Sequence, residues 1–197
     1  MSLTSIDHVE ISTSPCNRRD LLSGFSGLIT LGMMTGTLND ALGEEAIPET
    51  LVLKNLTQIA FVVKDIVNES ASFADTVGIP APEIILTAPL EQSKMMYRGK
   101  PSPAQAKLAF IKLGSLDIEL IEPVSEPSIW NDVLKEKGEG LHHLAFQVTD
   151  LNAMLAHLTR KGFETIQTGD FGTGRYAYVD TTPSLKTLIE LLEIVSK

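Results

Sequence analysis

The sequence contains a single cysteine, Cys16, and comparatively few basic residues. One cysteine cannot form an internal disulfide, and it excludes a cysteine-based metal site. Lysine and arginine number 16 against 25 aspartate and glutamate residues, which gives a net charge of −9. Such a surface repels the phosphate backbone, so a nucleic-acid partner is excluded. The remaining composition, 43% apolar and 21% charged over 197 residues, is typical of one globular domain or two small ones.

A long, strongly hydrophobic run is also missing. Residues 21–38 are uncharged but only mildly apolar, so they would barely span a bilayer. Arg18 and Arg19 precede this stretch and the small residues Ala41 and Gly43 follow it, so residues 1–43 resemble a twin-arginine export signal. A disordered or amphipathic cytosolic extension and a marginal membrane helix are the alternatives. We expect an exported protein, with a cytoplasmic location as the alternative, and no stable membrane span in the mature form.

One stretch of the sequence occurs twice. Residues 55–66 (NLTQIAFVVKDI) align without gaps with residues 140–151 (GLHHLAFQVTDL), and five positions are identical. The segments 116–122 (LDIELIE) and 187–193 (TLIELLE) match in the same way, but at a shorter offset. A repeat of this kind indicates two copies of one supersecondary unit. The shorter offset places an insertion in the first copy, between about residues 88 and 106.

Each copy is expected to follow the order β-α-β-β-β. Alternating apolar residues predict an opening strand over 56–63 and an equivalent strand in the second copy. Helices are predicted over 67–77 and 152–161, because Asp65 and Asp150 stand at N-cap positions. The other strands are expected at 83–87, 107–113 and 116–122 in the first copy, and at 164–167, 175–179 and 186–193 in the second.

We therefore predict an α+β fold in which two tandem β-α-β-β-β modules form one metal-binding cleft. Module 1 covers about residues 55–123 and module 2 about residues 141–195, within one domain of residues 55–195. A helix over 129–137 links the modules, and residues 44–54 form a linker before them. Two sheets, each backed by helices, are expected to turn their roomier faces toward each other.

Four polar residues share that roomier face. Side chains alternate along a strand, so Gln58 and His143 lie on the same face as a small alanine. Glu119 and Glu190 take this face of the two closing strands. Because burying carboxylates without a partner costs several kcal/mol, a shared cleft calls for a cation. We predict one divalent metal ion (Ni, Co, Zn, Mn or Mg) bound by Gln58, Glu119, His143 and Glu190.

Neighbouring polar residues are expected to be structural or solvated. Alternation turns His142 away from His143, and it turns Glu122 and Glu193 to the outer face, near strand ends. The insertion and the strand after it carry a basic cluster in an otherwise acidic protein. Most such clusters are exposed surface, and the functional alternative is a clamp for an anionic substrate group. The cluster comprises Lys94, Arg98, Lys100 and Lys107.

The paired modules and their four candidate ligands resemble the vicinal oxygen chelate superfamily of glyoxalases, bleomycin-resistance proteins and dioxygenases. Residues 138–146 (GEGLHHLAF) and 113–123 look like the methylmalonyl-CoA epimerase branch. The ligand order Gln-Glu-His-Glu is more similar to some glyoxalase I enzymes. The resemblance implies that Glu190, or alternatively Glu119, transfers a proton. One position departs from the epimerases, since Pro103 stands where they carry a second acid/base glutamate.

The resemblance implies a metal-dependent lyase or isomerase, glyoxalase I-like or epimerase-like, that moves a proton next to a carbonyl through an enediolate-type intermediate. A small molecule is the expected partner, and we also expect a homodimer. Two other classes stay open. A non-enzymatic drug-binding module would usually lack the metal set. An iron dioxygenase would normally present two histidines and one glutamate, and Gln58 disfavours it.

Overall fold

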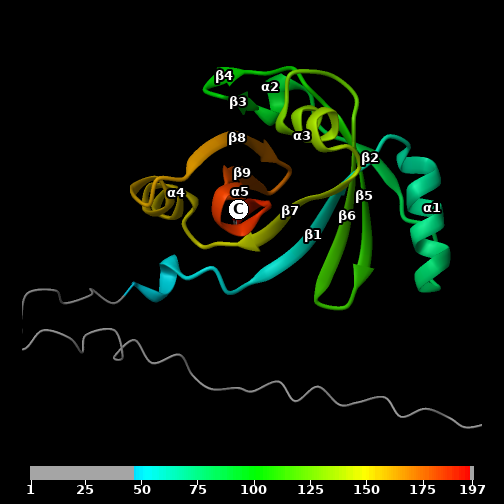
Figure 1. Cartoon of the computed structure of the whole chain (residues 1–197), viewed down its shortest axis with the longest axis horizontal. Coiled ribbons are helices and arrows are strands. Elements are labelled where there is room, and N and C mark those ends of the chain that lie inside the picture. Colours follow the sequence, from blue (N-terminus) through cyan, green and yellow to red (C-terminus); the bar gives the residue numbers. More distant parts are fainter. Residues whose placement is uncertain (1–46, 196–197) are drawn as a thin grey trace, which may run out of the picture. The chain divides into compact units, whose positions relative to one another are not determined.

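The computed structural model describes residues 47–195 (Figure 1). The export signal expected over residues 1–43 lies outside this range, as do the first residues of the expected linker, so both stay predictions. A short 3-10 helix, η1 (Glu49–Leu51), precedes the first strand. No helix within the described range is long and apolar enough to cross a bilayer.

The described chain contains five α-helices besides η1, and ten strands. The helices are α1 (Ile66–Val77), α2 (Leu90–Ser93), α3 (Ile129–Lys137), α4 (Leu151–Arg160) and α5 (Thr182–Leu185). The strands are β1 (Leu56–Val62), β2 (Ile84–Leu86), β3 (Met96–Tyr97), β4 (Lys100–Pro101), β5 (Ala106–Leu113), β6 (Leu116–Pro123), β7 (Gly140–Gln147), β8 (Glu164–Phe171), β9 (Gly174–Asp180) and β10 (Leu188–Ile194).

The predicted α+β fold with two β-α-β-β-β modules is confirmed. Module 1 consists of β1, α1, β2, β5 and β6, and module 2 consists of β7, α4, β8, β9 and β10. The expectation of two separate sheets is wrong. The strands form one sheet in the order β2-β5-β6-β1-β7-β10-β9-β8-β3-β4, because β1 and β7 pair antiparallel where the modules meet. This sheet curls into a half-barrel (Figure 1).

The insertion in the first module adds to the sheet of the second. It contains α2 and the short strands β3 and β4, and β3 pairs antiparallel with β8 through Met96 opposite Thr168 and Tyr97 opposite Gln167. These two-residue strands carry no alternation that could be recognised in the sequence. The insertion therefore crosses from module 1 and covers the far edge of module 2.

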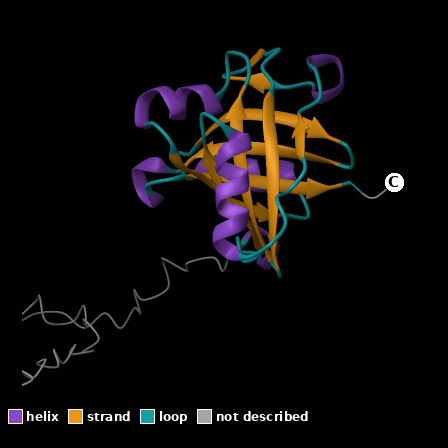
Figure 2. Ribbon diagram, turned by 90° about the vertical axis from the view of Figure 1, so that its right-hand side faces the viewer, coloured by secondary structure: helices purple, strands orange, loops and turns teal. Residues whose placement is uncertain are grey.

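The two long helices of the modules begin and end as predicted. The carboxylates of Asp65 and Asp150 accept hydrogen bonds from the backbone N–H groups of Asn68 and Ala153, which confirms both N-caps. Gly78 ends α1 at φ 77°, a left-handed conformation that costs glycine little. Figure 2, viewed from the α1 side, shows this helix lying across the strands.

Glu122 and Glu193 hold these helices in place, so the expectation that water solvates them is wrong. Each glutamate accepts a hydrogen bond from the first backbone N–H of its module's helix and pairs with a basic residue of the preceding strand. The partners are Ile66 N and Lys107 for Glu122, and Leu151 N and Arg175 for Glu193. A carboxylate at a helix N-terminus satisfies an unpaired donor and interacts favourably with the helix dipole.

The core lies on both faces of the sheet, as the alternation in β1 predicts. Ile59 and Phe61 pack with α1 on one face, whereas Ala60 and Val62 pack on the other face with α3. The second module buries an equivalent apolar cluster around α4. The face that carries Ala60 is the one on which the candidate ligands lie.

Candidate metal centre

Two adjacent rows of side chains cross the centre of the sheet, and each row has an alanine between two polar residues. The rows are Glu119–Ala60–His143, from β6 through β1 to β7, and Gln58–Ala145–Glu190, from β1 through β7 to β10. The register thus confirms that Gln58 and His143 occupy equivalent strand positions, as do Glu119 and Glu190. The alanines leave space above the sheet between the longer side chains.

Three of the four candidate ligands meet on this face. Glu119, His143 and Glu190 are buried, and each places one ligand atom within 4.8 Å of the others. His143 Nε2 lies 3.1 Å from Glu190 Oε2 and 3.4 Å from Glu119 Oε2. Within residues 47–195, Glu119 Oε2 and His143 Nε2 have no hydrogen-bond partner. Buried polar atoms are rarely left unpaired, so the cluster fits a divalent cation.

Burial decides the charge state of the cluster. It raises the pKa of Glu119 well above its usual value, with the nearby Glu190 and Asp117 carboxylates adding to the shift. Burial also raises the pKa of Glu190 to about 8, although the Tyr178 hydroxyl partly offsets this effect. The pKa of the His143 imidazole falls to about 3 for the same reason. Without a cation the centre therefore favours neutral groups, and a divalent ion would instead favour both carboxylates.

Metal affinity should accordingly rise with pH, and this can be measured. Below about pH 8 a metal must displace the proton from Glu190, and the raised pKa of Glu119 means that it must displace a proton there too, so affinity should rise by up to about tenfold per pH unit for each proton released. His143 is neutral throughout this range and should release none. Calorimetric titrations in buffers of different ionisation enthalpy would count the protons. Equal affinity at about pH 6 and about pH 8 would contradict the assignment of these glutamates as ligands.

The cluster faces a cavity of about 510 Å³. Glu119, Glu190 and Gln58 all line it, and Gln58 is half-buried. A cavity of this size suits a small molecule. The position of Gln58 is compatible with a fourth ligand, and that assignment stays a prediction.

Aromatic residues that the sequence did not single out complete the wall. Tyr178 lies opposite Glu190 in the register of β9 and β10, and Phe110 lies opposite Glu119 in the other module. The Tyr178 hydroxyl accepts a hydrogen bond from Trp130 Nε1 at 3.2 Å. Burial and the two carboxylates raise the pKa of Tyr178, so it keeps its proton. The two-residue spacing of Tyr176 and Tyr178 places both tyrosines on one face of a strand, and this pattern in the sequence could have identified them.

His142 does not turn away from His143, which corrects the expectation from strand alternation. A β-bulge shifts the pairing of β1 and β7, so that Ala60 faces His143 while Phe61 faces Leu141. The bulge places the His142 ring beside that of His143, with the two Nδ1 atoms 2.9 Å apart. An equivalent shift occurs in the first module, where Thr57 is passed over.

A hydrogen bond between the two Nδ1 atoms requires that one imidazole carries a proton on Nδ1 and that the other does not. A metal on His143 Nε2 leaves the proton on Nδ1, which then donates to Nδ1 of His142. We expect His142→Leu to lower metal affinity about 10–100-fold, because His143 loses the group that fixes its tautomer and orientation. Isothermal titration and ¹⁵N spectra of the imidazoles would measure both effects.

Thr57→Val is the matched control for His142→Leu. Thr57 occupies the equivalent bulged position in module 1 and lines the cavity. Its hydroxyl makes only a long hydrogen bond to the Ala145 carbonyl, at 3.3 Å. Wild-type metal affinity in a folded His142→Leu protein would refute the positioning role of His142.

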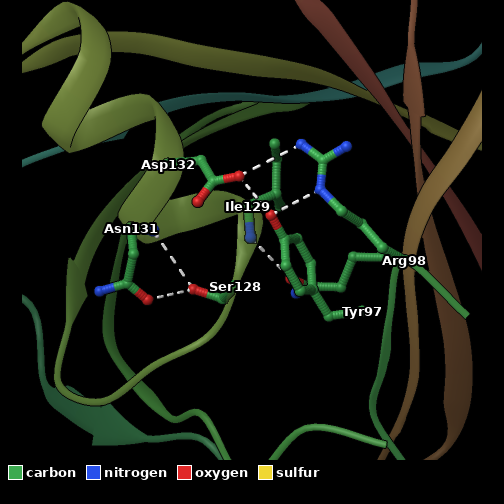
Figure 3. Close-up of polar contacts among 7 residues, drawn as sticks. Tyr97, Arg98, Ser128, Ile129, Asn131 and Asp132 are labelled. Carbon is green, nitrogen blue, oxygen red and sulfur yellow. Dashed lines mark hydrogen bonds and ion pairs between the residues drawn. The ribbon is translucent and has the colours of Figure 1, made fainter. Parts of the chain in front are cut away.

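The basic cluster does not gather as an anion clamp. Lys94 pairs with Asp170 at 3.0 Å, and Lys107 binds Glu122 on the outer face. Arg98 donates from Nε to the Tyr97 hydroxyl at 2.8 Å and lies 3.3 Å from Asp132 (Figure 3). Lys100 lies exposed in β4. None of these four side chains is among those that line the cavity.

The chain belongs to the glyoxalase/bleomycin resistance protein/dioxygenase superfamily, whose family model matches residues 57–179. This match confirms the resemblance seen in the sequence. The matched range begins in β1 and ends in β9, so it includes Gln58, Glu119 and His143.

The sequence identity between this chain and individual relatives is low. The chain is 32% identical over 93 residues to the uncharacterized protein YqjC of Bacillus subtilis, covering 45% of this chain and 66% of that protein. It is 24% identical over 115 residues to the mitochondrial methylmalonyl-CoA epimerase of Mus musculus, covering 58% and 57%. The chain therefore spans less than two thirds of the length of either relative.

Solved structures show the same fold. The crystal structure of methylmalonyl-CoA epimerase from Mycobacterium tuberculosis superposes with a TM-score of 0.52 at 20% identity. The match covers 77% of this chain and 95% of the epimerase. Similarity at this level shows a shared fold and does not identify the reaction.

Proposed function

We propose that the protein is a divalent-metal-dependent lyase or isomerase that moves a proton next to a carbonyl group. The observation that supports this most is the buried cluster of Glu119, His143 and Glu190 beneath a cavity large enough for a small molecule. Two carboxylates and one imidazole form an oxygen-rich set that suits Ni, Co, Zn, Mn or Mg. The epimerase relatives support an isomerase-type enzyme, and the finer subclass rests on the site.

Glu190 is the proposed base. The metal, when held by Glu119, His143, Glu190 and Gln58, supplies Lewis acidity that stabilises negative charge on two neighbouring substrate oxygens. Glu190 lies at the cavity wall, so its carboxylate can reach a proton on the carbon next to the carbonyl. The C–H bond breaks, the proton moves to Glu190, and the electron pair shifts to the carbonyl oxygen as an enediolate. Delivery of the proton to the neighbouring oxygen-bearing carbon, in place of the carbon that it left, gives the product.

The environment of Pro103 favours a glyoxalase I-like over an epimerase-like subclass. Pro103 is exposed, and the neighbouring Ala104 lines the cavity in its place. No carboxylate therefore enters the cavity from this position, where the epimerases carry their second acid/base. The two glutamates of the metal centre are the groups left to move protons.

Deuterium uptake tests the proposal directly. Metal-loaded protein in heavy water should incorporate deuterium next to the carbonyl of a 2-oxo, α-hydroxycarbonyl or thioester compound, and metal-free protein should not. Nuclear magnetic resonance or mass spectrometry of the recovered compound would detect the exchange. Incorporation no faster than with metal-free protein, across all three classes, would overturn the proposal.

Export and homodimerisation are also proposals. The export proposal is supported by the sequence of residues 1–43, and fractionation of cells that produce the full chain would test it. Light scattering on the purified protein would test the homodimer. A monomer that binds metal normally would show that each chain carries a complete centre.

A further inference from the structure

The structure points to an uncharged substrate with an apolar body, and we propose this as the substrate class in place of an anionic thioester. The inference rests on the proposed function, since it takes the cavity above the metal centre as the substrate site. It predicts two neighbouring oxygens at one end of the substrate, for the metal, and a hydrocarbon or aromatic group at the other.

The walls and mouth of the cavity are predominantly apolar. Its interior includes Met95, Leu108 and Phe110. At its mouth, Leu86 and Ile194 keep 57% and 49% of their surface exposed, and both line the cavity. Exposed apolar side chains grouped around a cavity favour a ligand that covers them, because this removes apolar surface from water.

Every charged residue that lines the cavity is acidic. These residues are Asp117, Glu119, Asp170 and Glu190. With a divalent ion, the two positive charges are balanced by the carboxylates of Glu119 and Glu190. Asp117 and Asp170 add no positive charge to the walls, so the lining contains no cationic side chain that would attract an anion.

The lysines near Asp117 and Asp170 already form ion pairs with them. Lys94 pairs with Asp170 at 3.0 Å, and Lys112 pairs with Asp117. Neither lysine lines the cavity. A substrate carboxylate or phosphate would have to break one of these ion pairs or lie beside an acidic side chain. Binding of a neutral molecule has no such cost, because it breaks neither ion pair and brings no like charges together.

A matched pair of ligands tests the proposal. We would titrate 2-hydroxyacetophenone and its para-carboxylate into the Co²⁺-loaded full chain, with methylmalonyl-CoA as a polyanionic thioester. The neutral ketone should bind at least about tenfold more tightly than either anion, because like charges placed together in a site are strongly unfavourable. Equal or tighter binding of an anion would overturn the substrate class.

Exchange measurements on the same samples separate this proposal from the proposed function. Preferential binding of the ketone without deuterium uptake from heavy water would support the substrate class and count against the proton-transfer function. Uptake into methylmalonyl-CoA at a rate equal to that of the ketone would support the function and overturn the substrate class.

Asp170→Asn provides a second, independent readout. Removing this carboxylate leaves Lys94 without its partner at the edge of the cavity, so binding of the para-carboxylate should improve about tenfold while binding of the ketone stays unchanged. Asp75→Asn makes the same charge change at an exposed position on α1 and should alter neither. An unchanged preference in folded Asp170→Asn would show that this acidic wall does not select the substrate.

Discussion

Glu190→Gln should retain most of the bound metal and lose exchange of the substrate's α-proton. The amide oxygen can still coordinate a divalent ion, but an amide cannot accept the proton. General-base catalysis typically contributes about 10²–10⁴-fold, so the exchange rate should fall by at least that factor. Metal content and deuterium uptake, measured on the same preparation, would separate binding from proton transfer.

Glu119→Gln is the matched control, because Glu119 occupies the equivalent position in the other module. This variant should also retain most of its metal, because the amide oxygen still coordinates, and it should keep exchange of the α-proton. If Glu190→Gln exchanges at the wild-type rate and Glu119→Gln does not, the base is Glu119. If both variants exchange at the wild-type rate with metal bound, neither glutamate is the base.

His143→Ala should lose metal and exchange together, since alanine supplies no ligand. Metal affinity should fall by more than the about 10–100-fold that follows the loss of an outer partner of a ligand, such as His142. The loss should persist at every pH tested, because His143 is neutral over the working range. Affinity titrations and elemental analysis would measure the change.

His157→Ala is the control for this substitution. His157 lies on α4, a helix that covers the opposite face of the sheet, and its side chain is half-buried and away from the metal centre. Its removal should leave metal affinity unchanged. A His143→Ala protein that binds metal as tightly as His157→Ala would remove His143 from the proposed ligand set.

Strand alternation and the internal repeat predicted the two modules and the strands that carry the candidate ligands, although they did not predict the single sheet that joins the modules. The Ala-Phe pair that follows Ile59 in β1 and Leu144 in β7 indicated the faces, and Asp65 and Asp150 indicated the helix starts. The equivalence of Glu119 and Glu190 followed from aligning the closing segments. These features depend on local periodicity, which can be read directly from the sequence.

The features that the sequence did not predict depend on contacts between distant segments. His142 turns toward His143 because the pairing of β1 with β7 shifts by a residue, and alternation within one strand cannot reveal such a bulge. The joining of both modules into one sheet likewise depends on this pairing. Glu193 accepts a hydrogen bond from the backbone N–H of Leu151, 42 residues earlier in the chain, and the local sequence does not indicate this contact.

The basic cluster shows the same limit. Lys94, Arg98 and Lys107 are near one another in sequence, yet each pairs with a different acidic residue, namely Asp170, Asp132 and Glu122. The sequence left an anion clamp open as the alternative to exposed surface, whereas the folded chain pairs these charges singly with acidic residues. The pairing of Lys94 with Asp170 is one of the observations behind the proposal of an uncharged substrate.

The central claim is that Glu119, His143 and Glu190 bind a divalent metal. Its most direct test is the metal content of purified full-length protein after exhaustive dialysis, together with that of the His143→Ala variant. We expect about one divalent metal ion per wild-type chain and almost none per variant chain. Wild-type protein that takes up no ion when offered Ni, Co, Zn, Mn or Mg, or a variant that retains its ion, would contradict the claim.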